Sequence, residues 1–154
     1  AKFGASDVQD LNWVQLLNAY TCTECGRCTS TCPANITGKK LSPRKIMMDT
    51  RDRLEEVGKN IDANKGVFVP DNKSLLNDYI TAEELWACTS CNACVEECPV
   101  SISPLSIIMD MRRYLVMEQS AAPMPINAMM TNIENNGAPW QYSQQDRLNW
   151  KNEN

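Results

Sequence analysis

The spacing of the cysteines constrains this chain more than any other feature of its sequence. All eight cysteines fall in two runs with the pattern C-x2-C-x2-C-x3-C-P. The runs consist of Cys22, Cys25, Cys28 and Cys32, and of Cys88, Cys91, Cys94 and Cys98. This pattern is typical of thiolates that hold 4Fe-4S clusters, where the fourth cysteine of one run binds the cluster of the other run. The sequence therefore predicts two 4Fe-4S clusters.

Crossed ligation joins the two halves of the chain through metal. The predicted ligands of one cluster are Cys22, Cys25, Cys28 and Cys98, and those of the other are Cys88, Cys91, Cys94 and Cys32. Pro33 and Pro99 follow the fourth cysteines, and because proline fixes φ and has no N–H, each can turn the chain away from a cluster. Four thiolates leave no open iron for a substrate, so both clusters are expected to carry electrons.

Two other uses of the cysteines fit the sequence less well. A disulfide framework suits a small secreted domain, but residues 1–30 lack the apolar stretch of a signal peptide. A zinc site would use two C-x2-C pairs separated by a longer loop. The chain also contains no histidine, which removes Ser-His and Cys-His catalytic pairs. We predict no catalytic residue.

The charge balance limits the kinds of partner. The formal charge is -4, without a basic block, which argues against a nucleic-acid surface. No apolar run approaches the roughly 18 residues that cross a bilayer, so no membrane span is expected. Each oxidised cluster adds about two negative charges, giving about -8 in total. A docking partner should be locally basic.

A repeated segment follows each cysteine run. Residues 41–54 (LSPRKIMMDTRDRL) and 102–115 (ISPLSIIMDMRRYL) match at 7 of 14 positions. Each begins with a serine that can cap a helix and a proline suited to its first turn, followed by apolar residues at helical spacing. A helical pattern also precedes each run, over 11–19 with Asp10 as the cap and over 82–87 behind a Thr81-x-x-Glu84 capping box.

The distance between the runs selects the fold class. The 55 residues between Cys32 and Cys88 are too many for a compact β-rich ferredoxin, and only Gly66–Pro70 is a candidate strand. We therefore predict an all-α helical ferredoxin with two pseudo-two-fold related halves. The predicted division is a dicluster domain over 1–118, with halves at about 10–58 and 78–118 and a linker at about 59–77, and a C-terminal extension over 119–154. In that extension we expect a helix over 126–133 that stops at Gly137, and another that runs from a Ser143 cap to Lys151.

Several side chains near the cysteines have more than one interpretation. Tyr20 and Trp86 each precede a run by two residues and could cover a cluster or belong to the core. Ile36 and Ile102 are expected to shield the clusters. Five basic residues lie near the first run, whereas Glu96 and Glu97 lie near the second. If the basic residues are close to the first cluster, its reduction potential should be higher than that of the second; the alternative is that they are solvated surface charges. The five are Arg27, Lys39, Lys40, Arg44 and Lys45.

The doubled motif, the SPxxI helices and the segment ENNGAPWQYSQQDRLNW at 134–150 carry a family resemblance. Over about residues 10–150 the chain resembles the C subunit of heterodisulfide reductase and the helical-ferredoxin module of CCG-domain iron-sulfur oxidoreductases. The resemblance implies a module that relays single electrons to or from a catalytic partner, either a CCG-domain or a flavin-containing subunit or domain. It also implies a place in the cytoplasm, or at the inner face of the membrane through a partner or an N-terminal segment. The chain has no CCG motif, so we expect no complete active site in it.

Three alternatives stay open. The chain could be the iron-sulfur subunit of a flavin dehydrogenase of the succinate/fumarate, glycolate or glycerol-3-phosphate type, although the plant-type cluster domain typical of the first is absent from the sequence. It could be a freely diffusing ferredoxin, or a protein whose clusters are only folding staples. Because the chain begins without methionine and FGASD at 3–7 resembles a junction to upstream membrane helices, we expect an excised module of a longer protein.

Overall fold

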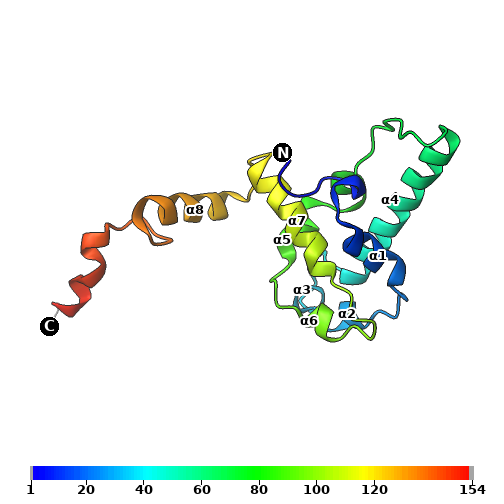
Figure 1. Cartoon of the computed structure of the whole chain (residues 1–154). Coiled ribbons are helices and arrows are strands. Elements are labelled where there is room, and N and C mark those ends of the chain that lie inside the picture. The colour runs from blue at the N-terminus through cyan, green and yellow to red at the C-terminus, as the bar shows by residue number, and fades with distance from the viewer. Residues whose placement is uncertain (1, 153–154) are drawn as a thin grey trace. The chain divides into compact units, whose positions relative to one another are not determined.

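The computed structural model describes residues 2–152, and within that range it contains helices and no strand (Figure 1). The prediction of an all-α fold is confirmed for these residues, and the candidate strand at Gly66–Pro70 is a loop. The chain divides between Gln119 and Ser120 into two compact units, each described by itself below. No helix within 2–152 combines the length and the apolar character that crossing a bilayer requires.

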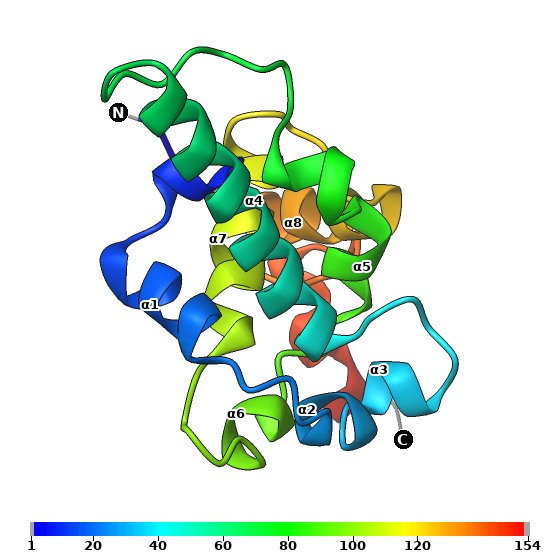
Figure 2. The same cartoon turned by 90° about the vertical axis from the view of Figure 1, so that its right-hand side faces the viewer.

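The first unit repeats one order of elements. A helix leads into a cysteine loop, a short helix lies within the loop, and a longer helix follows. The elements are η1 (Val8–Asp10), α1 (Trp13–Thr21), α2 (Arg27–Ser30), α3 (Pro33–Ile36), α4 (Pro43–Ala63), η2 (Leu75–Tyr79), α5 (Ala82–Ala87), α6 (Ala93–Glu96) and α7 (Pro104–Met117). Helix α1 packs on α4 and α5 packs on α7, while α4 meets α7 and α2 meets α6 across the repeat (Figure 2). The two cysteine loops therefore lie at the same end of the unit.

Most helix starts agree with the sequence. The hydroxyl oxygens of Ser42 and Ser103 accept hydrogen bonds from N–H groups in the first turns of α4 and α7, and Thr81 and Glu84 form the expected capping box of α5. The predicted cap of the first helix was wrong. Asn12 caps α1, because the Asp10 carboxylate accepts the Asp7 N–H and completes the cap of η1 instead.

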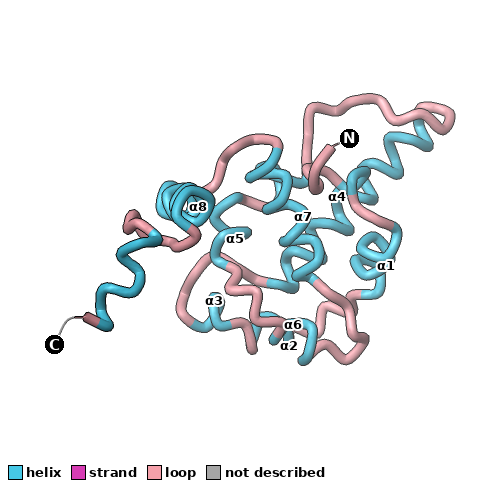
Figure 3. Tube along the Cα trace, turned by 60° about the vertical axis from the view of Figure 1, so that its left-hand side comes forward, coloured by secondary structure: helices cyan, strands magenta, loops and turns pink. Residues whose placement is uncertain are grey.

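The core of the first unit lies between the long helices and is made mainly of the apolar faces of the repeated segments. Its fully buried side chains include Ile46, Met47, Leu75, Ile80, Leu85, Ile107, Ile108 and Met111. Helix α4 continues to Ala63, beyond the predicted start of the linker, and the loop after it leads to η2 (Figure 3). The cysteine loops are thus attached to rigid helices on both sides.

One buried arginine joins three separate segments of this unit. The Arg53 side chain on α4 has 0% exposure. Its Nη2 donates to Asp7 Oδ2 at 2.8 Å and to the Lys73 carbonyl at 2.8 Å, and its Nη1 donates to Asp71 Oδ2 at 2.5 Å. These hydrogen bonds raise the pKa of Arg53, and the guanidinium lowers the pKa of the Asp71 carboxyl to about 2. The N-terminal segment, α4 and the following loop therefore depend on one guanidinium.

The N-terminal segment lies directly on α7. Gly4 has φ +74, and a Cβ placed there would lie 2.3 Å from the Asp110 carbonyl oxygen and 2.4 Å from the Tyr114 nitrogen. The N–H of Ala5 donates to the same Asp110 carbonyl at 3.0 Å. Only glycine allows so close an approach of two backbones in this conformation.

We expect Gly4→Ala to destabilise the holoprotein by about 1 to 3 kcal/mol, because the methyl group must push the segment off α7. Gly38→Ala is the matched control, since Gly38 has φ +79 but a Cβ added there would have no atom within 4 Å. Denaturant unfolding followed by circular dichroism measures both. Equal losses in the two variants would show that backbone strain alone, and not the close approach, matters at Gly4.

The second unit is a helical extension. Helix α8 (Met124–Asn136) ends at Gly137, which has φ 65, and η3 (Gln144–Lys151) begins behind the Ser143 side chain. Both helices were expected, although α8 is longer than predicted and η3 is a 3-10 helix. Met129, Met130 and Ile133 are exposed on α8.

Candidate metal centre

The two cysteine loops have the same backbone conformation. Each run begins where a helix ends, with Cys22 directly after α1 and Cys88 directly after α5. Two residues after the first cysteine, both loops adopt a positive φ, 58° at Glu24 and 57° at Ser90. A second left-handed residue then precedes each short helix: Gly26 before α2 and Asn92 before α6. Glycine and asparagine are the residue types that adopt this conformation most readily.

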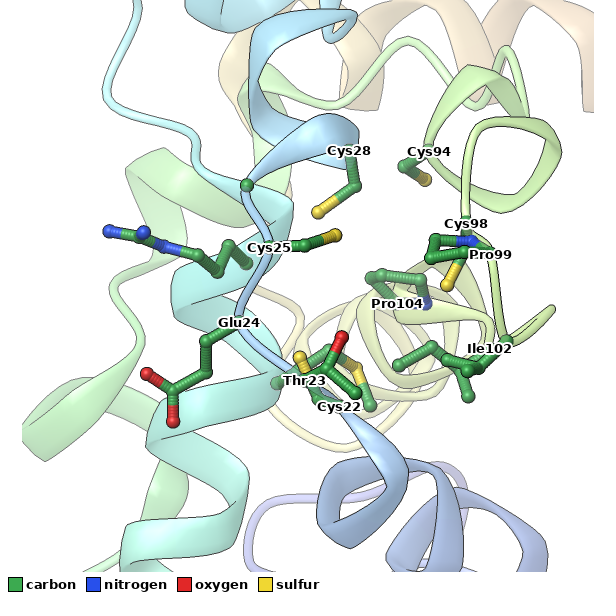
Figure 4. Close-up of a pocket in the computed structure, with 14 residues that line it drawn as sticks. Cys22, Thr23, Glu24, Cys25, Cys28, Cys94, Cys98, Pro99, Ile102 and Pro104 are labelled. Atoms are coloured by element: carbon green, nitrogen blue, oxygen red, sulfur yellow. The ribbon is translucent and has the colours of Figure 1, made fainter.

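The first cavity combines cysteines from both halves. Its empty volume is about 350 Å³ when open solvent is included, and Cys22, Cys25 and Cys28 line it. Cys98 and Cys94 line it from the other half, and Figure 4 shows Cys98 facing the loop that carries the first three cysteines. Cys32 is not among the lining residues. The first three cysteines thus meet the last cysteine of the other run.

Cys94 lies close to Cys28 of this cavity and also to Cys32 and Cys88. Burial raises the pKa of Cys94 to about 11, and the neighbouring Cys88, Cys28 and Cys32 add to the increase because their thiolates would repel its own. Cys88 also lines a separate cavity with Pro33, the residue after Cys32. Cys91 is exposed, and the Ala93 N–H lowers its pKa. Cys94 therefore lies between the two groups of thiols.

The donor set fits an iron-sulfur cluster. All eight thiols are free, and between residues 2 and 152 no three cysteine, histidine or acidic side chains gather closely enough to bind one metal ion. In a 4Fe-4S cluster each thiolate binds a different iron, so the ligands surround a larger group. Burial raises the pKa of Cys28, and iron would offset this cost by replacing the thiol proton.

Apolar side chains form part of the wall of the first cavity. Met47, Ile102 and Pro104 line it, and Ile102 is buried as expected. The same expectation was wrong for Ile36, which is 68% exposed. The first half has five more residues between its CP and SP pairs, so Leu41, which aligns with Ile102 in the repeat, is buried instead at 2% exposure.

The two aromatic residues before the runs differ in their surroundings. Tyr20 is 52% exposed, so its interpretation as a core residue was wrong. Trp86 is half-buried, and the guanidinium of Arg112 lies 4.9 Å from the centre of its ring. Sequence reasoning missed Arg112 and its repeat partner Arg51 as residues near the cysteines. The available signal was the arginine shared by both copies of the repeat.

Two of the basic residues expected near the first cluster are paired with acidic side chains. Lys40 lies 2.8 Å from Glu83, and Lys45 lies 2.7 Å from Asp49 and 2.9 Å from Glu84. These acidic partners partly neutralise the positive charges of Lys40 and Lys45. Arg44 lines the first cavity and is exposed.

A helical fold that gathers eight free thiols at two cysteine loops defines an iron-sulfur protein of the ferredoxin class. The chain belongs to the 4Fe-4S dicluster domain family, whose profile matches residues 21–102. It acts as an iron-sulfur electron-transfer module. The resemblance to heterodisulfide reductase and related iron-sulfur oxidoreductases is confirmed by the relatives that follow.

Three relatives show what this chain is similar to. The "Probable iron-sulfur-binding oxidoreductase FadF" of Bacillus subtilis is 36% identical over 98% of this chain and 25% of the relative. The "Probable membrane-anchored ferredoxin" of Chromohalobacter salexigens is 34% identical over 97% of this chain and 24% of the relative. The C subunit of the ferredoxin/F(420)H(2)-dependent CoB-CoM heterodisulfide reductase of Methanosarcina acetivorans is 31% identical over 70% of this chain and 52% of the relative. The chain spans about a quarter of the length of the first two relatives.

Proposed function

We propose that this module relays electrons through two 4Fe-4S clusters, held by crossed ligation. The ligands of one are Cys22, Cys25, Cys28 and Cys98, and those of the other are Cys88, Cys91, Cys94 and Cys32. The observation that carries the proposal is the cavity that Cys22, Cys25 and Cys28 share with Cys94 and Cys98 of the second run, and that Cys32 does not line. Each cluster, when bound, accepts and releases one electron at a time.

The chain's own residues would hold the clusters and limit their contact with water. The eight thiols lose their protons when iron binds. Met47, Ile102 and Pro104 form the apolar wall of the first cavity, and an apolar surround controls solvent access to a metal site and so its potential. Since α2 packs against α6, the two loops hold their cysteines next to each other. This arrangement suits transfer of an electron from one cluster to the other.

The partner we propose is a CCG-domain or flavin-containing oxidoreductase, present as a separate subunit or as another domain of a longer chain. Two relatives are about four times as long as this chain, which supports a module within a larger protein. We further propose residues 1–118 as the cluster-binding domain and 119–154 as an extension that leads to the partner or docks on it. The exposed Met129, Met130 and Ile133 of α8 support the second assignment.

For location, we propose the cytoplasm or the inner face of the membrane, with attachment through a partner or an additional segment. The name of the Chromohalobacter relative, a probable membrane-anchored ferredoxin, supports the attachment.

A redox titration tests the proposed function. The anaerobically purified holoprotein, titrated with dithionite in the presence of mediators, is expected to take up about two electrons per chain and to release them on reoxidation, one for each cluster. Electron paramagnetic resonance follows the reduced clusters. Irreversible bleaching on reduction would contradict the relay and favour clusters that only stabilise the fold.

A further inference from the structure

Arg51 on α4 and Arg112 on α7 occupy the same position of the duplicated segment, but they have different electrostatic partners. In the repeat, 41–54 aligns with 102–115 and places the two arginines opposite each other. Each lies close to the first cysteine of its half, Cys22 or Cys88. Equivalent cations therefore stand beside equivalent cysteines.

In the first half the charge is cancelled locally. The Arg51 Nη2 forms an ion pair with the Glu24 Oε1. Glu24 lies between Cys22 and Cys25 and lines the first cavity. A negative charge added to a cluster in the first cavity would be attracted by Arg51 and repelled by Glu24. The two effects on its electrostatic energy largely offset each other.

In the second half the equivalent cation, Arg112, forms no ion pair with a carboxylate of the described residues. The Arg112 Nε and Nη2 donate to the Leu85 carbonyl at 2.9 and 2.6 Å, and Nη2 also donates to the Cys88 carbonyl. Within residues 2–152 no carboxylate forms an ion pair with Arg112, although its neighbour Arg113 pairs with Asp110. The position equivalent to Glu24 is Ser90, with the same backbone conformation. The guanidinium is therefore held by neutral groups, the carbonyls of Leu85 and Cys88 and the ring of Trp86.

We propose that Arg112 is a positioning residue that favours reduction of the cluster beside Cys88, whereas Glu24 cancels the equivalent effect of Arg51 on the cluster beside Cys22. This inference rests on the proposed pair of clusters. One electron from a reduced donor adds one negative charge to the cluster that it enters, and a half-buried cation close by stabilises that charge. Arg44 at the first cavity is exposed, so solvent screens its charge more strongly.

The same arginine also fixes the geometry of its loop. Because the guanidinium bonds the carbonyls of Leu85 and Cys88 and lies over Trp86, it joins α7 to the end of α5 where the second cysteine run begins. A purely structural role would change how much cluster the chain holds. An electrostatic role changes the reduction potential of the cluster that remains.

The first test removes the charge of Arg112. In the holoprotein, Arg112→Gln is expected to lower the ratio of reduced to oxidised cluster in the second half about tenfold at a fixed potential, the order expected for one nearby charge. For one electron this corresponds to about 59 mV. Arg112→Lys should restore most of the potential, and Arg113→Gln, which alters an exposed paired arginine, should leave it unchanged. Electron paramagnetic resonance during a redox titration measures each cluster, and a Cys91→Ala variant identifies the signal of the second half.

The second test exchanges the residues that differ between the loops. Ser90→Glu introduces the acidic residue of the first half and should lower the potential of the second cluster. Glu24→Ser frees Arg51 and should raise the potential of the first cluster. Both variants keep the hydrogen bonds of Arg112. They therefore test the electrostatic effect on the reduction potential even if Arg112→Gln fails to retain its cluster. If both cluster signals are reversible but their potentials do not change in Ser90→Glu and Glu24→Ser, this inference is overturned and the two-cluster proposal is retained. If the wild-type protein does not show two cluster signals, the two-cluster proposal itself is overturned.

Discussion

Removing Cys98 is expected to abolish the cluster beside Cys22 and to spare the cluster beside Cys88, although Cys98 belongs to the second run. The reason is that Cys98, and not Cys32, lines the cavity of Cys22, Cys25 and Cys28. The sharpest form of the test begins from a Cys22→Ala/Cys25→Ala variant, which lacks two ligands of one cluster and should keep about four irons per chain.

Adding a third substitution then separates the two ligand patterns. Under crossed ligation, Cys98→Ala in that background costs no further iron, because its cluster is already gone. Cys32→Ala in the same background removes a ligand of the remaining cluster, so the iron content should fall again. Circular dichroism of each variant checks that the helices are retained. If Cys98→Ala depletes the remaining iron and Cys32→Ala does not, each run binds its own cluster and the crossed assignment is wrong.

Replacing Arg53 by methionine is expected to destabilise the holoprotein by about 3 to 5 kcal/mol, the usual loss when one partner of a buried ion pair is removed. The guanidinium has 0% exposure, and its loss leaves the carboxylates of Asp7 and Asp71 beside an uncharged side chain. It also removes the donor to the Lys73 carbonyl. The N-terminal segment and the loop after α4 would lose their common anchor.

The control for this prediction is Arg113→Met. Arg113 also forms an ion pair, with Asp110, but its side chain is exposed, and exposed pairs contribute about 0 to 1 kcal/mol. Urea unfolding of the two holoproteins gives the comparison. A loss below about 1 kcal/mol for Arg53→Met would mean that the buried network contributes no more than a surface pair.

Local sequence signals predicted the elements that depend on local chemistry. The Ser-Pro starts of α4 and α7 and the capping box at Thr81 were correct because a cap involves residues only three positions apart. The cap of α1 was predicted wrongly because Asp10 had a competing local partner in the Asp7 N–H. The capping propensity of Asp10 alone does not show whether it caps α1 or the preceding turn, η1.

Features that depend on contacts between residues distant in the sequence could not be predicted from local patterns. No local pattern indicated that Gly4 would contact Asp110, or that Arg53 would join Asp7 to Asp71. For the site, equal spacing predicted matching cysteine loops, but Ile36 was placed wrongly because the insertion after the first run moved Leu41 into the equivalent position. The sequence also could not show that Lys40 pairs with Glu83, because the two residues are distant along the chain.

The iron and sulfide content of the anaerobically purified chain, combined with Mössbauer spectroscopy, tests the central claim most directly. We expect about eight irons and about eight sulfides per chain, all in the spectral components of thiolate-ligated 4Fe-4S clusters. About four irons per chain, or stoichiometric zinc in place of iron, would contradict two clusters held by the eight cysteines.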